Sequence, residues 1–398
     1  MKIKENRFVK TIEEYTTLVL SSFINIKFRH KIGYNSDDIR NIAIIKLDHI
    51  GDVILSIPAL NNIRNRFPNV KITMVVNPSS KSIAEFIPYI DDVVCYNARF
   101  FDRSGSAKMF DIIKGIRFAF DMKKRDFDLI VDLRGSFASI FFAIVSKSKY
   151  RIDRGSYLLK RKIKRQKNNV IRDSFAIKQK GDRYTLKHEA EIGLDILSKA
   201  GIDIITRESN LKNPDFSMIN LPSNLLQREN MKEELIITIH PGGPMLQKRW
   251  SADNYIELIK LILSNLDSKI LLIGGKDETE LVGSIFSAVN DERVVDLSGK
   301  LSISQLLYNL WVTDLFIGND SGPMHIASAC GTKVIGLYGP TDPERFGPFG
   351  KNCIALRMEK KCPPCSHGNC RFNNYRCIDQ ISVKDVMDTI NDILNIKL

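Results

Sequence analysis

A run of small and polar residues follows a short apolar segment at 315–317. The segment stops at Gly318, and Pro323 favours the first turn of a helix just beyond it. A helix N-terminus offers unpaired N–H groups to an anion such as a diphosphate. The residues of this stretch that we predict to bind a ligand are Asp320, Ser321, Gly322 and His325.

A second loop of the same kind ends the next predicted strand, Lys333 to Tyr338, at Gly339-Pro340-Thr341. Ordinary strand-to-helix turns also favour Gly, Ser and Asp, so either loop alone has a purely structural explanation. Two such loops in tandem favour a ligand site, because the carboxyl ends of parallel strands meet at one edge of a sheet.

Earlier in the chain, a nearly continuous apolar run at 41–47 predicts a buried parallel strand. It leads into Gly51 and Asp52 at the start of a helix predicted for 53–66. Gly51 allows close backbone approach or a positive φ. Asp52 is either a helix cap or a general base facing a crevice. Another strand, 127–133, ends in Arg134.

The elements that position these residues alternate between strand and helix twice, with a polar break at 208–233 that contains Pro214 and Pro222. This alternation predicts an α/β protein of two doubly wound, Rossmann-like domains around a crevice. The expected parts are an N-terminal helical extension at 1–40, a first domain at 41–215 and a second at 230–398. We expect the C-terminal helix, 382–396, to cross back onto the first domain, and the basic segment 150–187 to be a loop or lid.

The composition is that of a globular protein, with 43% hydrophobic and 26% charged residues in 398. The net charge of +13 predicts an anionic partner, although a merely solvated basic surface explains it equally well. No nucleic-acid module accompanies the basic residues. No apolar run reaches the length of a membrane span, and no signal peptide is evident, so we expect a cytoplasmic protein.

Four of the seven cysteines cluster near the C-terminus. A disulfide framework is not expected in the cytoplasm, which leaves reduced thiols or a structural metal, and the spacing fits no standard zinc ribbon. The members of this weak candidate metal site are Cys362, Cys365, Cys370 and Cys377.

Three separated motifs together resemble glycosyltransferase family 9, whose best-known members are lipopolysaccharide heptosyltransferases. They read IKLDHIGDVILSIPAL at 45–60, IHPGGPMLQKRWSADNY at 239–255 and GNDSGPMHIASACGTKVIGLYGPTDPERFGP at 318–348. The likeness covers about 41–396. No G-x-G-x-x-G follows the first strand and there is no P-loop or G-x-S-x-G elbow, which counts against other nucleotide-dependent and hydrolytic classes.

The resemblance implies a GT-B fold and an inverting, metal-independent transfer of heptose from ADP-heptose to a phosphorylated glycolipid acceptor. It places Asp52 as the general base and Lys248 as the cation that neutralises the donor diphosphate. Gly51 and Arg134 are implied at the acceptor side, and no cofactor is required. The resemblance implies that the residues of the 320–325 loop and Gly339 bind the donor. It also implies donor contacts for His240, Gly242 and the acid at Asp277 or Glu278.

Two departures from the family pattern leave the substrates open. Ser321 stands where heptosyltransferases commonly have threonine, and 40 residues precede the usual start. The alternatives are another sugar donor or a surface-polysaccharide acceptor, followed by a sugar-nucleotide epimerase and a non-enzymatic scaffold. An ionised carboxylate is the form that a base requires, so Asp52 need not have a raised pKa. The basic segment is consistent with a peripheral location at the inner membrane face.

Overall fold

The computed structural model describes residues 36–97, 109–154 except 136–138, 140–141 and 144, then 176–178, 184–213, 234–357 and 376–396. Most of the expected N-terminal extension, the most basic part of 150–187, and three cysteines of the cluster (Cys362, Cys365 and Cys370) lie outside the described residues. The chain divides into two compact units, Met1–Glu208 and Ser209–Leu398, at the N-terminal edge of the polar break.

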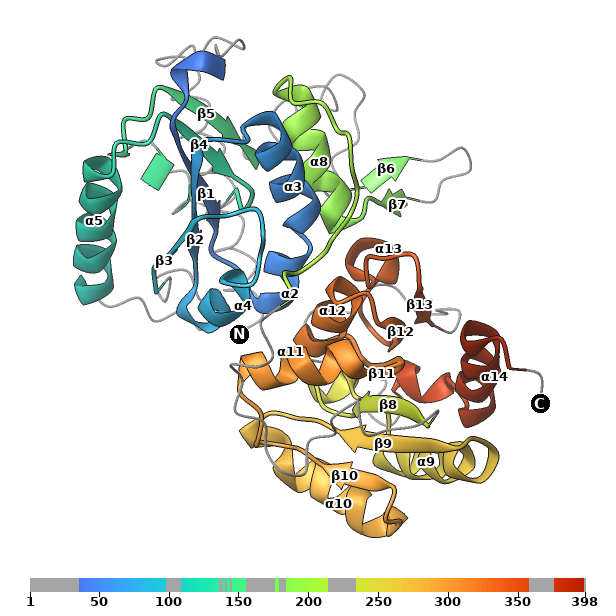
Figure 1. Cartoon of the computed structure of the whole chain (residues 1–398). Helices are drawn as coiled ribbons and strands as arrows, with labels where there is room; N and C mark the ends of the chain where they lie inside the picture. The colour runs from blue at the N-terminus through green and yellow to red at the C-terminus, as the bar shows by residue number, and fades with distance from the viewer. Residues whose placement is uncertain are drawn as a thin grey trace. The chain divides into compact units, whose positions relative to one another are not determined.

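The first unit is built on a five-stranded parallel sheet in the order β3-β2-β1-β4-β5. Helix α5 covers one face of this sheet, and α3 and α8 cover the other (Figure 1). The sheet and its helices are β1 (Asn41–Lys46), α2 (Ile50–Ile54), α3 (Ile57–Arg66), β2 (Lys71–Val76), α4 (Lys81–Ala84), β3 (Asp92–Cys95), α5 (Met109–Lys124), β4 (Leu129–Asp132), β5 (Tyr150–Asp153) and α8 (Glu189–Lys199).

Two expectations for the first unit were wrong in detail. The helix predicted for 53–66 is broken into α2 and α3, because Pro58 suits the first turn of a helix and not its interior. The segment 150–187 is not only a loop: Tyr150–Asp153 pairs with β4, and β6 (Ala176–Lys178) pairs antiparallel with β7 (Tyr184–Leu186). These strands are only three or four residues long, and β5 contains two charged residues, so none of them shows the apolar pattern on which strand prediction depends.

The second unit has a six-stranded parallel sheet in the order β10-β9-β8-β11-β12-β13. Helices α9, α10 and α14 share one apolar core with the sheet, whereas α11 and α12 contact each other and strands β8, β11 and β12. The elements are β8 (Leu235–His240), α9 (Ala252–Asn265), β9 (Ser268–Leu272), α10 (Thr279–Val289), β10 (Val294–Asp296), α11 (Ile303–Val312), β11 (Leu315–Asn319), α12 (Gly322–Ala329), β12 (Lys333–Leu337), α13 (Pro343–Phe346), β13 (Cys353–Leu356) and α14 (Val383–Leu394).

The C-terminal helix α14 packs against α9 and the sheet of the second unit, and our expectation that it crosses back onto the first domain stays a prediction. A Ser382–Asp385 capping box begins the helix. Its apolar side, including Val386 and Ile390, is buried against α9 and the sheet. The apolar residues recur at helical spacing, so their burial on one face is what the 3.6-residue period requires.

Each sheet has one point where the strand order reverses, between β1 and β4 in the first unit and between β8 and β11 in the second. Helices leave the two strands of such a pair toward opposite faces, so their carboxyl ends border a natural crevice for ligands. The candidate residues Asp52 and Arg134 follow the first pair of strands, and His240 and Ser321 belong to the second.

Candidate active site

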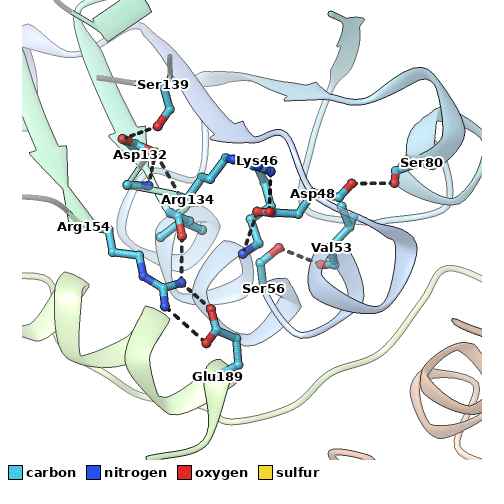
Figure 2. A network of polar contacts seen from close by, with 12 residues as sticks. Lys46, Asp48, Val53, Ser56, Ser80, Asp132, Arg134, Ser139, Arg154 and Glu189 are labelled. Carbon is cyan, nitrogen blue, oxygen red and sulfur yellow. Dashed lines mark hydrogen bonds and ion pairs between the residues drawn. The ribbon is translucent and has the colours of Figure 1, made fainter. Parts of the chain in front are cut away.

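Charged side chains from the two central strands meet at the reversal point of the first unit. Lys46, the last residue of β1, places its Nζ 3.1 Å from Asp48 Oδ2. The other oxygen of Asp48 accepts a 2.5 Å hydrogen bond from Arg134 Nη1, which comes from the loop after β4 (Figure 2). Burial raises the pKa of Asp48, but Lys46 and Arg134 hold it far below its usual value.

A second layer of polar contacts fixes the loop that carries Arg134. Asp132 accepts N–H bonds from Arg134 and Gly135, at 2.9 and 3.0 Å, and a hydroxyl bond from Ser139. Arg154 forms a buried, two-pronged ion pair with Glu189 at the start of α8, and its Nη1 also donates to the Leu133 carbonyl (Figure 2). The guanidinium thus ties α8 to the end of β4.

Asp52 lies in the first turn of α2, close to this layer. Within the described part of the chain, no hydrogen bond or ion pair involves its carboxylate. Burial is the main influence that raises the pKa of Asp52, and Asp48 and Glu189 add to it, whereas Lys46 and His49 act in the opposite direction. A partly buried carboxylate with a raised pKa is a stronger proton acceptor than an ordinary aspartate.

Gly51 and Arg134 are the two residues that we predicted to contact the acceptor. Gly51 belongs to α2, so the positive φ that we considered for it is wrong. Arg134 is about one quarter exposed, at 24%, while bound to Asp48, so its guanidinium retains donors for an anionic ligand.

Where the strand order of the second unit reverses, the His240 side chain contacts residues of two neighbouring loops. Its Nδ1 lies 3.0 Å from Ser321 Oγ, and its Nε2 lies 3.0 Å from Glu278 Oε2. All three side chains are buried. The Glu278 carboxylate also accepts backbone N–H bonds from Gly243 at 2.7 Å and Gly275 at 2.8 Å. Glu278 therefore joins the loop after β9 to the loop after β8, and His240 connects both to the loop after β11.

This arrangement explains the glycine at 242. A Cβ placed there would lie 2.0 Å from Glu278 Oε1, far inside any normal contact. Gly339, after β12, is equally constrained by Ile378 Cβ at 3.0 Å and the Gln247 carbonyl at 3.1 Å. Both glycines are needed because other backbone or bound side-chain groups come very close.

The charged pair of the second unit is Lys248 and Asp320. Lys248 Nζ donates to Asp320 Oδ2 at 2.5 Å; the Asp320 side chain is almost fully buried, whereas that of Lys248 is partly exposed. Asp320 and Ser321 immediately precede α12, whose first residue is Gly322, and His325 is buried in that helix. The structure thus brings Lys248, Asp320 and Ser321 together at the N-terminus of one helix, and His240 contacts Ser321 there.

Asn319 is a site residue that our sequence reasoning missed. Its amide NH₂ donates to the carbonyls of Pro241 and Gly242, at 2.9 and 2.8 Å. Its oxygen accepts from the Trp250 backbone N–H and the Tyr255 hydroxyl, both at 3.1 Å. The sequence signal that was available is an asparagine close after the apolar run 315–317, because a polar side chain at the end of a buried strand must find its hydrogen-bond partners locally.

The Glu278 contacts predict a specific dependence of stability on acid. Burial raises the pKa of Glu278, but the His240 contact and the two backbone N–H groups lower it from 4.5 to about 2. A depressed carboxyl pKa stabilises the fold above its unfolded-state value, and this contribution disappears as the pH falls from about 4.5 toward about 2. We expect Glu278→Gln to remove about 3 kcal/mol of that pH dependence, measured by urea unfolding at several pH values.

The matched control is Glu280→Gln, because Glu280 is exposed on the neighbouring helix α10. That variant should follow the wild-type curve. An unchanged acid transition in Glu278→Gln would show that the three contacts do not hold the carboxylate in its ionised form.

No group of three or more His, Cys, Asp or Glu side chains suited to a metal ion occurs in the part of the chain that the structure describes. Cys377 is the one member of the cysteine cluster inside that part, so the metal prediction stays a prediction. Among the described residues, none of the helices has the length and apolar character required to span a bilayer.

Comparison with known sequences gives a consistent group of relatives. A family model described as glycosyltransferase family 9 (heptosyltransferase) matches residues 116–376. Lipooligosaccharide heptosyltransferase 2 of Campylobacter jejuni is 29% identical over 40% of this chain, and the match spans only about half, 51%, of that relative. Lipopolysaccharide heptosyltransferase 1 of Campylobacter coli is 24% identical over 88% of this chain and 98% of its own length.

Solved structures show the same architecture. A glycosyl transferase family 9 protein of Veillonella parvula superimposes with a TM-score of 0.69 at 19% identity, over 90% of this chain and 98% of the other. Heptosyltransferase WaaC of Escherichia coli, solved with ADP-2-deoxy-2-fluoro heptose, gives 0.63 at 19% identity, over 88% and 99%. This likeness confirms the expected GT-B fold of two parallel, doubly wound sheets.

Proposed function

The chain belongs to glycosyltransferase family 9, and from this membership we propose that it is an inverting glycosyltransferase. The proposed donor is ADP-heptose, and the proposed acceptor is a phosphorylated glycolipid of the lipopolysaccharide inner core. The relatives described above, which are lipopolysaccharide and lipooligosaccharide heptosyltransferases, support this choice of substrates. We place the reaction at the cytoplasmic face of the membrane, where such an acceptor is anchored.

The observation that carries the proposal is the pairing of Lys248 with Asp320 at the N-terminus of α12. The donor's diphosphate would lie against the Lys248 ammonium and the free N–H groups of the helix, both of which favour negative charge. Asp320, an acceptor-only carboxylate, suits the hydroxyl groups of the sugar. Glu278 is the proposed partner of the adenosine ribose, and it already supports this loop through His240.

On the acceptor side, Asp52 is the proposed general base and Arg134 the proposed anchor for an acidic group of the acceptor. Asp52 would take the proton from the attacking hydroxyl as its oxygen bonds to the anomeric carbon. The bond from that carbon to the diphosphate breaks on the opposite face, and ADP leaves with the electron pair. We propose that Lys248 and the α12 N–H groups, and not a metal ion, stabilise the charge that develops on ADP.

Two other functions compete with this one. A different nucleotide sugar, or a surface-polysaccharide acceptor, would use the same residues, because a diphosphate and a hydroxyl are common to all such reactions. A sugar-nucleotide epimerase needs no base for an acceptor hydroxyl, so the partly buried Asp52 carboxylate, which makes no hydrogen bond among the described residues, argues against it.

The test is a thermal-shift panel with ADP, UDP, GDP, CDP and NAD. A nucleotide at about 100 times its dissociation constant stabilises a protein by about 2.7 kcal/mol, which a melting curve resolves. We expect ADP alone to raise the melting temperature, and Asp320→Ala and Lys248→Met to reduce that shift. Lys260→Met, on the exposed side of α9, is the control and should respond like wild type.

The outcomes separate the alternatives. A shift with UDP or GDP in place of ADP would keep the family and overturn the ADP-heptose assignment. If no nucleotide produced a shift, the donor-site proposal itself would be wrong. A positive result justifies transfer assays with ADP-heptose and isolated glycolipid acceptors.

A further inference from the structure

Three buried polar side chains form a continuous chain of contacts that ends at the N-terminus of α12. Glu278 Oε2 lies 3.0 Å from His240 Nε2, and His240 Nδ1 lies 3.0 Å from Ser321 Oγ. The exposed fractions are 8% for Glu278, 3% for His240 and 8% for Ser321. Both ring nitrogens are engaged, so the groups at the two ends of this chain decide where its protons lie.

The Glu278 end of the chain can only accept hydrogen bonds. Its carboxylate also receives the backbone N–H groups of Gly243 at 2.7 Å and Gly275 at 2.8 Å. Burial raises the pKa of Glu278, but His240 and these N–H groups lower it to about 2, so the carboxylate is ionised at neutral pH. An ionised carboxylate has no proton to donate. His240 Nε2 therefore carries a proton in every state of the ring.

The Ser321 end has a single proton to donate. Within the described part of the chain, its hydroxyl makes no hydrogen bond other than the one with His240, and its side chain does not cap α12. A neutral ring accepts the hydroxyl proton at Nδ1, which satisfies both groups. A charged ring would itself donate to Ser321 Oγ and leave the hydroxyl proton without an acceptor among those residues. The contacts therefore favour a neutral ring when no nucleotide is bound.

A diphosphate at this helix end changes the number of protons that the chain needs. Ser321 immediately precedes Gly322, the first residue of α12, where the diphosphate of the proposed donor would lie. The oxygens of an ionised diphosphate only accept hydrogen bonds. Three links must then be filled: Glu278 to His240, His240 to Ser321, and Ser321 to phosphate. The protein supplies two protons, from Nε2–H and the serine hydroxyl, so the third must come from solvent.

We propose that binding of a nucleoside diphosphate is coupled to the uptake of one proton at His240 Nδ1, which turns the Ser321 hydroxyl from the ring toward the phosphate. This inference rests on the proposed donor site, and it makes His240 a positioning residue that acts through Ser321. The proton comes from water and no covalent bond between heavy atoms changes. The imidazolium that forms lies between two negative groups, the Glu278 carboxylate and the phosphate.

The charges around the ring are consistent with this uptake. Glu278 and an incoming phosphate both stabilise an imidazolium. The Lys248–Asp320 pair, next to the serine in sequence, brings no net charge. Arg249, whose Nε donates to a carbonyl of the loop after β8 at 2.8 Å, acts in the opposite direction. The neighbouring strands β9 and β11 end in uncharged residues, and the other titratable group of α12 is the buried His325.

The experiment is a calorimetric titration of the full chain with ADP at about pH 8, in buffers that differ in ionisation enthalpy. At that pH, ordinary imidazole side chains and a terminal phosphate are both mostly deprotonated. The dependence of the measured heat on the buffer gives the number of protons taken up per ADP. His240→Gln keeps an amide N–H for Glu278 but has no basic nitrogen. Ser321→Ala removes the hydroxyl, and Ser321→Thr is the control that keeps it.

Wild type and Ser321→Thr should take up close to one proton per ADP, and the other two variants close to none. Wild-type affinity for ADP should fall by up to about tenfold per pH unit as the pH rises above about 8, and the variants without uptake should lose this dependence. NMR of ¹⁵N-labelled histidine should show Nδ1 gaining a proton when ADP binds, with Nε2 protonated throughout. The His240 resonances are identified by their loss in His240→Gln. A merely structural role for His240 would weaken binding without changing the proton count.

ADP binding to wild type without proton uptake would overturn the inference alone, as would equal uptake in Ser321→Ala. A ring that is already protonated on both nitrogens before ADP is added would also overturn it. If His240→Gln does not fold, the uptake measured in Ser321→Ala decides. Wild type that binds no ADP would overturn the donor-site proposal together with this inference, so the binding heat itself separates the two failures.

Discussion

Asp52→Asn is expected to lower kcat for sugar transfer by about 10²- to 10⁴-fold, the usual contribution of a general base. Asparagine keeps the size of the side chain but cannot accept the proton from the attacking hydroxyl. Because Asp52 belongs to the first unit and the proposed donor loop to the second, the thermal shift produced by ADP should not change. Asp121→Asn, on the exposed side of α5, is the matched control.

Asp52→Asn should also change how the rate of sugar transfer depends on pH. Burial places the pKa of Asp52 above the usual aspartate value, so the wild-type rate should fall as the pH drops through that raised pKa and the base is protonated. Asp52→Asn should lose this acid limb. Wild-type kcat in the variant would falsify the assignment and leave Asp52 as a residue that only stabilises the first turn of α2.

Gly242→Ala is the substitution for which we expect the largest loss of donor-site structure. The new methyl group would lie 2.0 Å from Glu278 Oε1 and 2.2 Å from its Cδ. The carboxylate cannot move aside without giving up its bonds to Gly243, Gly275 and His240. We expect a loss of about 3 kcal/mol in unfolding free energy, from overpacking and unpaired buried groups together. ADP should bind at least about tenfold more weakly, which corresponds to 1.4 kcal/mol.

Gly283→Ala is the control for this variant, because it makes the same chemical change in α10 where nothing lies within 4 Å of the added methyl. Alanine is the better helix former, so this control should gain about 0.5–1 kcal/mol. Urea unfolding and ADP titration of both variants make the comparison. A Gly242→Ala protein as stable as wild type would mean that the loop after β8 yields more easily than its contacts indicate.

The parts of the site that depend on sequence neighbours were predictable. Each buried parallel strand appears as an apolar run, and the residues directly after it must lie at the carboxyl edge of the sheet. This is why Asp52, Arg134 and the loop at 318–322 were identified from order alone. The GT-B fold followed from the same alternation together with the family motifs.

The pairings across the sheet were not predictable in this way. Asp48 meets Arg134 from 86 positions away, and Glu278 meets His240 from 38 positions away. Such contacts depend on which strands are adjacent, and the strand order is set by packing between distant segments. Local propensity also failed where charged residues formed the short strand β5 and where Pro58 divided a helix.

The indole of Trp250 donates a 2.9 Å hydrogen bond to the Ile381 carbonyl, just before α14, while its backbone N–H binds Asn319. Trp250 therefore connects the end of β11 with the segment just before α14. Protein engineers who wish to exchange donor preference between relatives should transplant 234–396 as one cassette. A shorter graft would leave the host's own final helix in place. The Trp250 indole would then face a carbonyl from a different protein, and the hydrogen bond that it makes to Ile381 would not be preserved.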